Sequence, residues 1–301
     1  MTTGMRRRIV PLVVVLAVVA ATGAVVLRIT SGGIPHLAEE SVCTVTGGGG
    51  GGGEGADREY RFSTVQAANA ATITAVGQER SLPERAVVIA LATAMQESKL
   101  VNLDYGDRDS LGLFQQRPSQ GWGSPSQVRD PRYAAGRFYD ALVRVPHWQT
   151  MPLTEAAQAV QQSGFPDEYA KWEPRASALA GALLGTVPAG LRCSFPRPAR
   201  PAPSQAATAT DSPRPSHTTE VVEALRRDYA AARAVGGGDR TIELTPANWV
   251  TASWLVANAE QLAVESVSFD GRTWTRSHGD RWTADDRAHP DRIAITVTGD
   301  Q

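Results

Sequence analysis

The sequence predicts a mainly α-helical domain that follows an N-terminal transmembrane helix and precedes a small α+β module. Three observations support this fold class. A charge-free apolar run occupies residues 9–27, helical patterns with little alternation dominate residues 60–191, and helical and alternating patterns are mixed after residue 218. A chain of 301 residues has room for one large domain or two modest ones with connecting segments.

The apolar run at residues 9–27 follows three arginines, Arg6, Arg7 and Arg8. At a helical rise of about 1.5 Å per residue it spans roughly 30 Å, the thickness of a bilayer core. Arginines on its N-terminal side favour a cytoplasmic N-terminus, with the rest of the chain outside the cell membrane. A cleaved secretory signal is the alternative and would make the protein secreted, but such signals have an apolar region of about 7–15 residues. The sequence therefore favours a single-pass anchor over residues 1–30.

The only two cysteines, Cys43 and Cys193, lie on the predicted external side and flank the helical domain. An even number of cysteines in an oxidising compartment favours one disulfide over two unpaired thiols. The disulfide would close a loop of about 150 residues, which is worth at most about 5 kcal/mol in the chain-entropy description.

Composition changes mark the connecting segments. Glycines dominate residues 47–55, so we expect a flexible tether over residues 31–59. Residues 195–217 are rich in Pro, Ala, Ser and Thr, which predicts a disordered, semi-extended linker. The helical domain is thereby placed at residues 60–194.

The predicted C-terminal module covers residues 218–301. Helical spacing appears at 218–235 and 245–262, and residues 264–276 alternate apolar and polar across a turn at Asp270-Gly271, which predicts a hairpin. Residues 292–299 add a strand. The module's tryptophans can stack on sugars, but their spacing favours a small core; they are Trp249, Trp254, Trp274 and Trp282.

Charge and ligand spacing exclude several classes of function. Thirty Lys and Arg residues against 31 Asp and Glu residues give a formal charge of -1, so no nucleic-acid partner is expected. The five histidines and two cysteines show no metal-ligand spacing, and we expect neither a metal nor a cofactor.

The segment "SLPERAVVIALATAMQESKL", residues 81–100, predicts a buried helix that ends in an acid. Ser81 and Glu84 have capping-box spacing, which places the helix start near Leu82. The following apolar residues leave no polar face. Glu97 lies near the C-terminus, where the helix dipole and desolvation both raise a carboxyl pKa. A carboxyl that stays protonated near neutral pH suits the general acid of glycosidic-bond cleavage; the alternative is an acid that simply reaches solvent.

A second motif, "SLGLFQQRPSQGWG", occupies residues 110–123. Gly112 allows close backbone approach, the amides of Gln115 and Gln116 can hydrogen-bond a sugar or Glu97, and Trp122 offers an aromatic face. A helix predicted at residues 154–162 then ends in "VQQSG", followed by a proline.

The order "ES", "GLFQ" and "VQQSG" resembles the lysozyme-like soluble lytic transglycosylases. In that family a Glu-Ser pair ends a buried helix, a Gly-Leu-Met-Gln motif follows, and a Tyr-Asn-Ala-Gly motif closes the site. Here Phe114 replaces the methionine, and residues 161–164 read Gln-Gln-Ser-Gly in place of the third motif. The resemblance covers roughly residues 60–190, and "FQQRPSQGWG" is also similar to wall-associated actinobacterial proteins.

The resemblance implies a lysozyme-like fold and peptidoglycan glycan strands as the partner. Glu97 would protonate the oxygen between MurNAc and GlcNAc, then take the proton of the MurNAc 6-hydroxyl as it closes a 1,6-anhydro ring. Ser98 and Gln115 would orient Glu97 or the substrate. Further substrate contacts would come from side chains along the groove, namely Gln116, Trp122, Gln161, Gln162 and Tyr169.

Two other functions stay open. Asp104, Asp107 and Asp109 lie between the first two motifs; one of them would activate water in a hydrolytic muramidase, although a solvated acidic loop is the simpler interpretation. The departure from Tyr at position 161 also permits a non-catalytic peptidoglycan-binding or scaffolding protein. A transporter has little support because no second apolar run of membrane length occurs.

Overall fold

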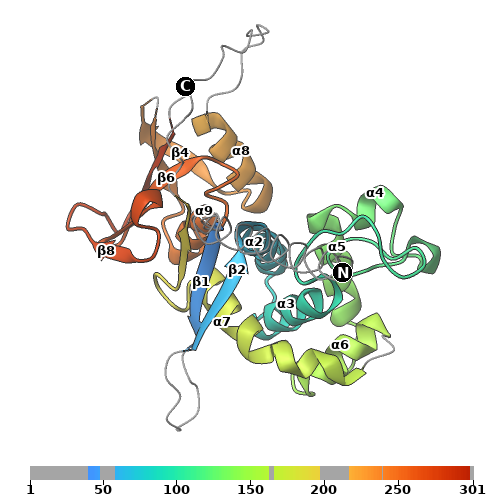
Figure 1. Cartoon of the computed structure of the whole chain (residues 1–301). Helices are drawn as coiled ribbons and strands as arrows, with labels where there is room; N and C mark the ends of the chain where they lie inside the picture. The colour runs from blue at the N-terminus through green and yellow to red at the C-terminus, as the bar shows by residue number, and fades with distance from the viewer. Residues whose placement is uncertain (1–39, 48–57, 163–165, 197–216, 239, 299–301) are drawn as a thin grey trace, which may run out of the picture. The chain divides into compact units, whose positions relative to one another are not determined.

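A computed structural model describes residues 40–47, 58–162, 166–196, 217–238 and 240–298 (Figure 1). The predicted anchor at 1–30, the glycines at 48–55 and nearly all of the predicted linker lie outside these residues. Among the helices that are described, none has the length and apolar character needed to span a membrane.

The first sheet joins segments from both ends of the predicted helical domain. Strand β1 (Val42–Gly47) lies between β2 (Arg58–Ser63) and β3 (Leu191–Ser194), and both pairings are antiparallel. Cys43 faces Cys193 across β1 and β3, and the predicted disulfide is confirmed.

Strand β1 departs from the tether predicted over residues 31–59. Cys43 and Val45 are buried while Thr44 and Thr46 are half-buried, an alternation that fits a strand with one covered face. Because β1 pairs with β2, the glycine run links two neighbouring strands instead of leading from a membrane segment to the domain. This short strand was missed in the sequence because it directly precedes the glycine run and was assigned to the same tether.

The helical part confirms the predicted mainly α-helical character. Its helices are α2 (Thr64–Glu79), α3 (Glu84–Ser98), α4 (Pro125–Val128), α5 (Pro131–Leu142), α6 (Leu153–Gln161) and α7 (Glu173–Leu183), with 3-10 turns η1 (Pro118–Gln120) and η2 (Pro166–Trp172). Helix α3 packs against α2, α5, α6, α7 and η2, and every residue from Ala86 to Met95 is buried. The expectation of a helix buried all round is therefore correct.

The start of α3 differs from the sequence interpretation. Ser81 has a positive φ of 54°, and the helix begins at Glu84 after Pro83, which makes no side-chain cap. The predicted capping box of Ser81 and Glu84 is therefore wrong. The spacing alone does not distinguish a capping serine from one that belongs to the preceding turn, where Ser81 donates its backbone N–H to Gln78.

The C-terminal residues form the predicted α+β structure. Helices α8 (His217–Asp228) and α9 (Trp249–Ala257) accompany a six-stranded antiparallel sheet, ordered β4-β5-β9-β6-β7-β8. Its strands are β4 (Arg233–Gly237), β5 (Thr241–Thr245), β6 (Val264–Phe269), β7 (Arg272–Thr275), β8 (Trp282–Ala284) and β9 (Ile293–Val297), and a 3-10 turn, η3 (Arg276–His278), follows β7. The hairpin at Asp270-Gly271 is confirmed, and three of the four tryptophans are buried as predicted, Trp254, Trp274 and Trp282.

The C-terminal elements pack directly on the helical part (Figure 1). Helix α9 contacts α2, α7 and β3. The indole of Trp282 donates to the Leu191 carbonyl at 2.8 Å, and that of Trp274 donates to the Cys193 carbonyl at 3.1 Å. Strand β3 therefore belongs to the first sheet and also accepts hydrogen bonds from tryptophans of the second sheet.

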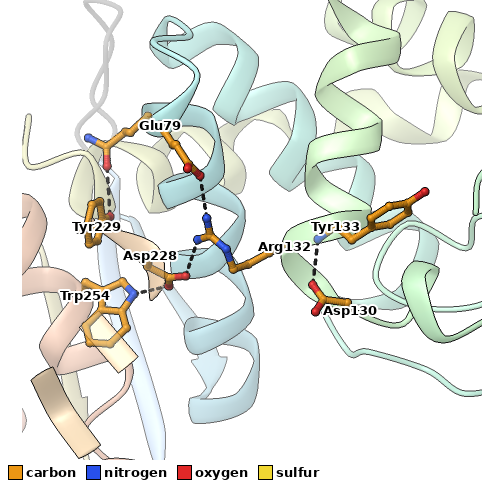
Figure 2. Close-up of polar contacts among 8 residues, drawn as sticks. Glu79, Asp130, Arg132, Tyr133, Asp228, Tyr229 and Trp254 are labelled. Carbon is orange, nitrogen blue, oxygen red and sulfur yellow. Dashed lines mark hydrogen bonds and ion pairs between the residues drawn. The ribbon is translucent and has the colours of Figure 1, made fainter. Parts of the chain in front are cut away.

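A partly buried polar contact also joins the two parts (Figure 2). Arg132, near the start of α5, donates to Asp228 at the end of α8 and to Glu79 at the end of α2, at 2.7 Å each. Asp228 accepts a further hydrogen bond from the Trp254 indole at 2.7 Å. The described residues from 40 onward accordingly belong to one compact unit.

Candidate functional site

Glu97 lies at the C-terminal end of α3, the central buried helix. The helix ends where Lys99 and Leu100 take positive φ angles of 57° and 60°, and the Leu100 N–H returns to the Ala94 carbonyl at 3.1 Å. Glu97 is the last residue but one of α3; it is half-buried and lines a pocket of about 880 Å³. Its carboxyl is therefore accessible from a cavity although the helix that carries it is not.

Neutral side chains hold the Glu97 carboxyl. The Tyr169 hydroxyl, from η2, donates to Glu97 Oε1 at 2.6 Å. Gln161, the last residue of α6, forms a second side-chain hydrogen bond with it. Within the described ranges Glu97 takes part in no ion pair, so the contacts that orient its carboxyl come from uncharged side chains.

Burial raises the pKa of Glu97 above its ordinary value of 4.5. Desolvation is the largest influence, while hydrogen bonds from Tyr169 and Gln161 and the charge of Lys99 act in the opposite direction. The C-terminal end of α3 adds a partial negative charge that also disfavours ionisation. The direction of the shift agrees with the one predicted from the position of Glu97 in the sequence.

The "GLFQ" segment forms a tight turn. Leu111 and Gln116 pair through two backbone hydrogen bonds of 3.0 Å, and residues 112–115 close the turn between them. Gly112 is required there: its φ is 78°, and a Cβ would lie 2.2 Å from the Val128 carbonyl oxygen. Leu113 and Phe114 are fully buried, which anchors the turn in the core.

Side chains from two helices hold the backbone carbonyls of this turn. The Ser98 hydroxyl donates to the Leu113 carbonyl at 2.7 Å, and Gln161 Nε2 donates to the Phe114 carbonyl at 2.7 Å. The ends of α3 and α6 and the turn are thereby joined at one point. Ser98, the "GLFQ" turn and Gln161 therefore meet next to Glu97.

The other predicted site residues occupy different places around the pocket. Gln115, Trp122 and Gln162 line it together with Glu97 and Gln161. Gln115 Nε2 lies 3.3 Å from the Tyr105 carbonyl and 3.2 Å from that of Gly112, so the loop before the turn orients the amide.

Three predicted substrate contacts are buried side chains, and of these Gln116 lines the pocket whereas Ser98 and Tyr169 do not. Ser98 is 5% exposed and its hydroxyl binds backbone. Gln116 is 2% exposed and donates to the Ala134 carbonyl of α5 at 3.0 Å. Tyr169 is fully buried, and its hydroxyl donates to the Glu97 carboxyl. In the structure the hydrogen-bond donors of these three side chains are engaged within the protein.

The acidic loop before "GLFQ" contributes one carboxylate to the pocket lining. Asp109 accepts from the Ser119 backbone at 2.7 Å and from Arg117 at 2.9 Å, and these hydrogen bonds lower its pKa to about 2. It is thereby engaged in holding the loop. Asp107 is exposed and lines the pocket, whereas Asp104 is not among the lining residues.

Sequence reasoning missed the basic side chains of the pocket. Four arginines line it, Arg108, Arg117, Arg137 and Arg144. They follow no regular spacing, because two come from the loop around "GLFQ" and two from α5 and the turn after it.

Comparison with protein-family models gives no match for this chain, and comparison with curated proteins gives none either.

Proposed function

We propose that this protein is a lytic transglycosylase that cleaves the bond between MurNAc and GlcNAc in peptidoglycan, with Glu97 as the acid and base. The observation that carries the proposal is the state of Glu97: a half-buried carboxyl with a raised pKa, held by neutral donors, at the wall of a large pocket. A carboxyl that retains its proton more readily at the wall of a pocket suits protonation of a glycosidic oxygen.

In the proposed reaction Glu97 acts twice. As the bond between MurNAc C1 and the GlcNAc oxygen breaks, the Glu97 proton passes to that oxygen, and positive charge develops at C1. The carboxylate left behind then takes the proton of the MurNAc 6-hydroxyl, whose oxygen attacks C1. Glu97 ends protonated, and the products are a GlcNAc hydroxyl and a 1,6-anhydro-MurNAc end.

The surroundings of Glu97 suit both halves of this cycle. Desolvation favours the protonated acid of the first step, and the hydrogen bonds from Tyr169 and Gln161 stabilise the carboxylate of the second. The contact of Gln161 with the "GLFQ" turn limits movement of the carboxyl relative to the groove. We further propose that the helical part has the lysozyme-like fold of this enzyme class.

The proposed substrate implies a location outside the cytoplasmic membrane. The Arg6–Arg8 cluster before the apolar run supports an N-terminal anchor with the domain on the wall side. The disulfide between Cys43 and Cys193 is consistent with an oxidising compartment. If the N-terminal segment is cleaved, the same domain would be secreted.

Product analysis tests the proposal. The full chain is incubated with purified peptidoglycan, and the soluble fragments are separated and weighed by mass spectrometry. We expect muropeptides with anhydro ends, which are one water lighter than hydrolysis products. Absence of any glycan cleavage, with binding retained, would instead identify a non-catalytic peptidoglycan-binding or scaffolding protein.

A hydrolytic muramidase is the second candidate, and one observation favours it. Asp107 lines the same pocket as Glu97 and is exposed, so it can activate a water molecule there. Reducing-end products, lost on Asp107→Asn, would support this reaction. Anhydro products that persist in Asp107→Asn would exclude it.

A further inference from the structure

Four arginines line the pocket that contains Glu97, and the proposed reaction gives none of them a role. Arg108 and Arg117 come from the loop around the "GLFQ" turn, Arg137 from α5, and Arg144 from the turn after α5. The carboxyl side chains that line the same pocket are Glu97 and Asp107. The pocket wall thus carries more basic than acidic groups.

The internal partners of these arginines leave donors available. Arg117 is paired through Nε with Asp109, and Arg108 lies 3.9 Å from Asp107 with both side chains largely exposed, a separation at which surface ion pairs contribute little. Arg137 donates Nη2 to the Gly121 carbonyl at 3.2 Å. Its Nε is buried and has no hydrogen-bond partner among the residues described.

Arg144 has the least engaged guanidinium of the four. Its side chain is exposed and forms neither a hydrogen bond nor an ion pair with the part of the chain that the structure describes. Arg137 lies in α5 and Arg144 in the turn just after it, and both line the same pocket. Together they offer several N–H donors to one ligand.

Uncharged sugar hydroxyls do not require such a surface. Amides and aromatic faces suffice for them, and the pocket already provides Gln115, Gln161 and Trp122. A planar guanidinium is instead suited to two-point binding of a carboxylate or phosphate, at roughly twice the strength of a neutral hydrogen bond. Arginines gathered beside sugar-binding groups therefore indicate a glycan that carries an oxyanion.

We propose that Arg137 and Arg144 form a subsite for an oxyanion substituent on the glycan strand, and so make the enzyme selective for anionic over neutral glycans. This inference rests on the proposed function, because it assumes that a glycan occupies the pocket. Two sources of the oxyanion share this chemistry: carboxylates of the lactyl group and stem peptide of MurNAc, and a phosphate ester on the strand.

Binding measurements test the subsite without turnover. Glu97→Gln in the full chain is titrated calorimetrically with a neutral chitin tetrasaccharide and with peptidoglycan tetrasaccharides that carry stem peptides, lack them but retain the lactyl carboxylate, or carry a phosphate ester. We expect the anionic ligands to bind about tenfold more tightly than the neutral one, the change that one charge-assisted hydrogen bond gives. The preference should decrease as salt is added.

Arginine variants then assign the preference to the subsite. Adding Arg137→Gln or Arg144→Gln should remove the preference for anionic ligands by about tenfold and leave binding of the neutral tetrasaccharide unchanged. Arg129→Gln is the matched control, since Arg129 is exposed and is not among the pocket residues. Circular dichroism and thermal melting confirm that each variant is folded.

The outcomes separate this inference from the proposed function. Equal affinity for neutral and anionic ligands, or a preference that survives both substitutions, overturns the subsite even if anhydro products are formed from peptidoglycan. Failure to bind any glycan overturns both. The ligand that binds most tightly identifies the source of the oxyanion as the lactyl group, the stem peptide or a phosphate ester.

Discussion

Glu97 in α3 and Asp228 in α8 both lie in the last turn of a helix, but their surroundings differ. The Asp228 carboxylate accepts from Arg132 and from Trp254, at 2.7 Å each, and is 8% exposed (Figure 2). Glu97 is held by Tyr169 and Gln161, which are uncharged, and it faces a pocket.

The comparison separates a structural acid from one that is available for proton transfer. A helix C-terminus disfavours negative charge in both places. At Asp228 the guanidinium of Arg132 compensates for this, and the carboxylate is enclosed by its partners. At Glu97 no guanidinium is in contact within the described residues, so desolvation raises the pKa and the proton is retained more readily.

Replacing Glu97 should have the largest effect on function. Glu97→Gln keeps the shape of the side chain but removes the proton donor, so we expect glycan cleavage to fall by about 10³-fold or more. Release of soluble muropeptides from peptidoglycan measures this. Glu155→Gln, at an exposed position in α6, is the control and should keep full activity. Normal cleavage by Glu97→Gln would remove the basis of the proposed function.

Replacing Asp228 should have the largest effect on stability. Asp228→Ala leaves Arg132 and the Trp254 indole without their buried acceptor, and we expect the free energy of unfolding to fall by about 3 kcal/mol. Urea unfolding followed by circular dichroism measures it. Asp280→Ala breaks an exposed pair with Arg281 and should leave the unfolding midpoint unchanged. The folded fraction of Asp228→Ala should cleave glycan normally; selective loss of activity would assign Asp228 a role in the site.

Tyr169→Phe should alter the pH dependence of cleavage. The Tyr169 hydrogen bond lowers the pKa of Glu97, so its loss should raise that pKa further and move the alkaline limb of the pH–rate profile to higher pH. We also expect the maximal rate to fall by about tenfold because the carboxyl loses a positioning contact. Tyr133→Phe, in α5, provides the control. An unchanged alkaline limb would mean that another group sets it.

The smallest effect concerns stability and pH. Because the pKa of Glu97 is raised above 4.5 in the folded protein, the folded state binds its proton more tightly than the unfolded state. Below pH 4.5 this favours the fold, and the advantage is lost as the pH rises through the folded pKa. Glu97→Gln should therefore become more stable relative to wild type from acid to neutral pH. Thermal melts over this range measure the difference, and a constant difference would contradict the raised pKa.

Local pattern predicted much of the fold and the centre of the site. The run of apolar residues identified α3 as a buried helix. The position of Glu97 near the end of that helix gave the direction of its pKa shift. Both properties depend on neighbours in sequence. The motifs also singled out Gln115 and Gln161 as site residues, and both line the same pocket as Glu97.

The rest depends on contacts between distant residues. Tyr169 lies 72 positions from Glu97, and its contact with the carboxyl depends on the path of η2. The arginines converge only when α5 packs beside the "GLFQ" turn. Arg132 and Asp228 are 96 positions apart, so no local signal marks them as partners. Strand β1 was hidden because glycines dominate the stretch in which it ends.

Strand β3 contacts both the helical part and the C-terminal part of the protein. Its backbone carbonyls at Leu191 and Cys193 receive the indole N–H groups of Trp282 and Trp274, and Cys193 is also linked covalently to Cys43. A single protease nick between residues 197 and 216 would therefore leave two fragments that still adhere. When the fragments on either side of that nick are co-expressed as separate polypeptides, they should associate and form the folded structure of the intact chain.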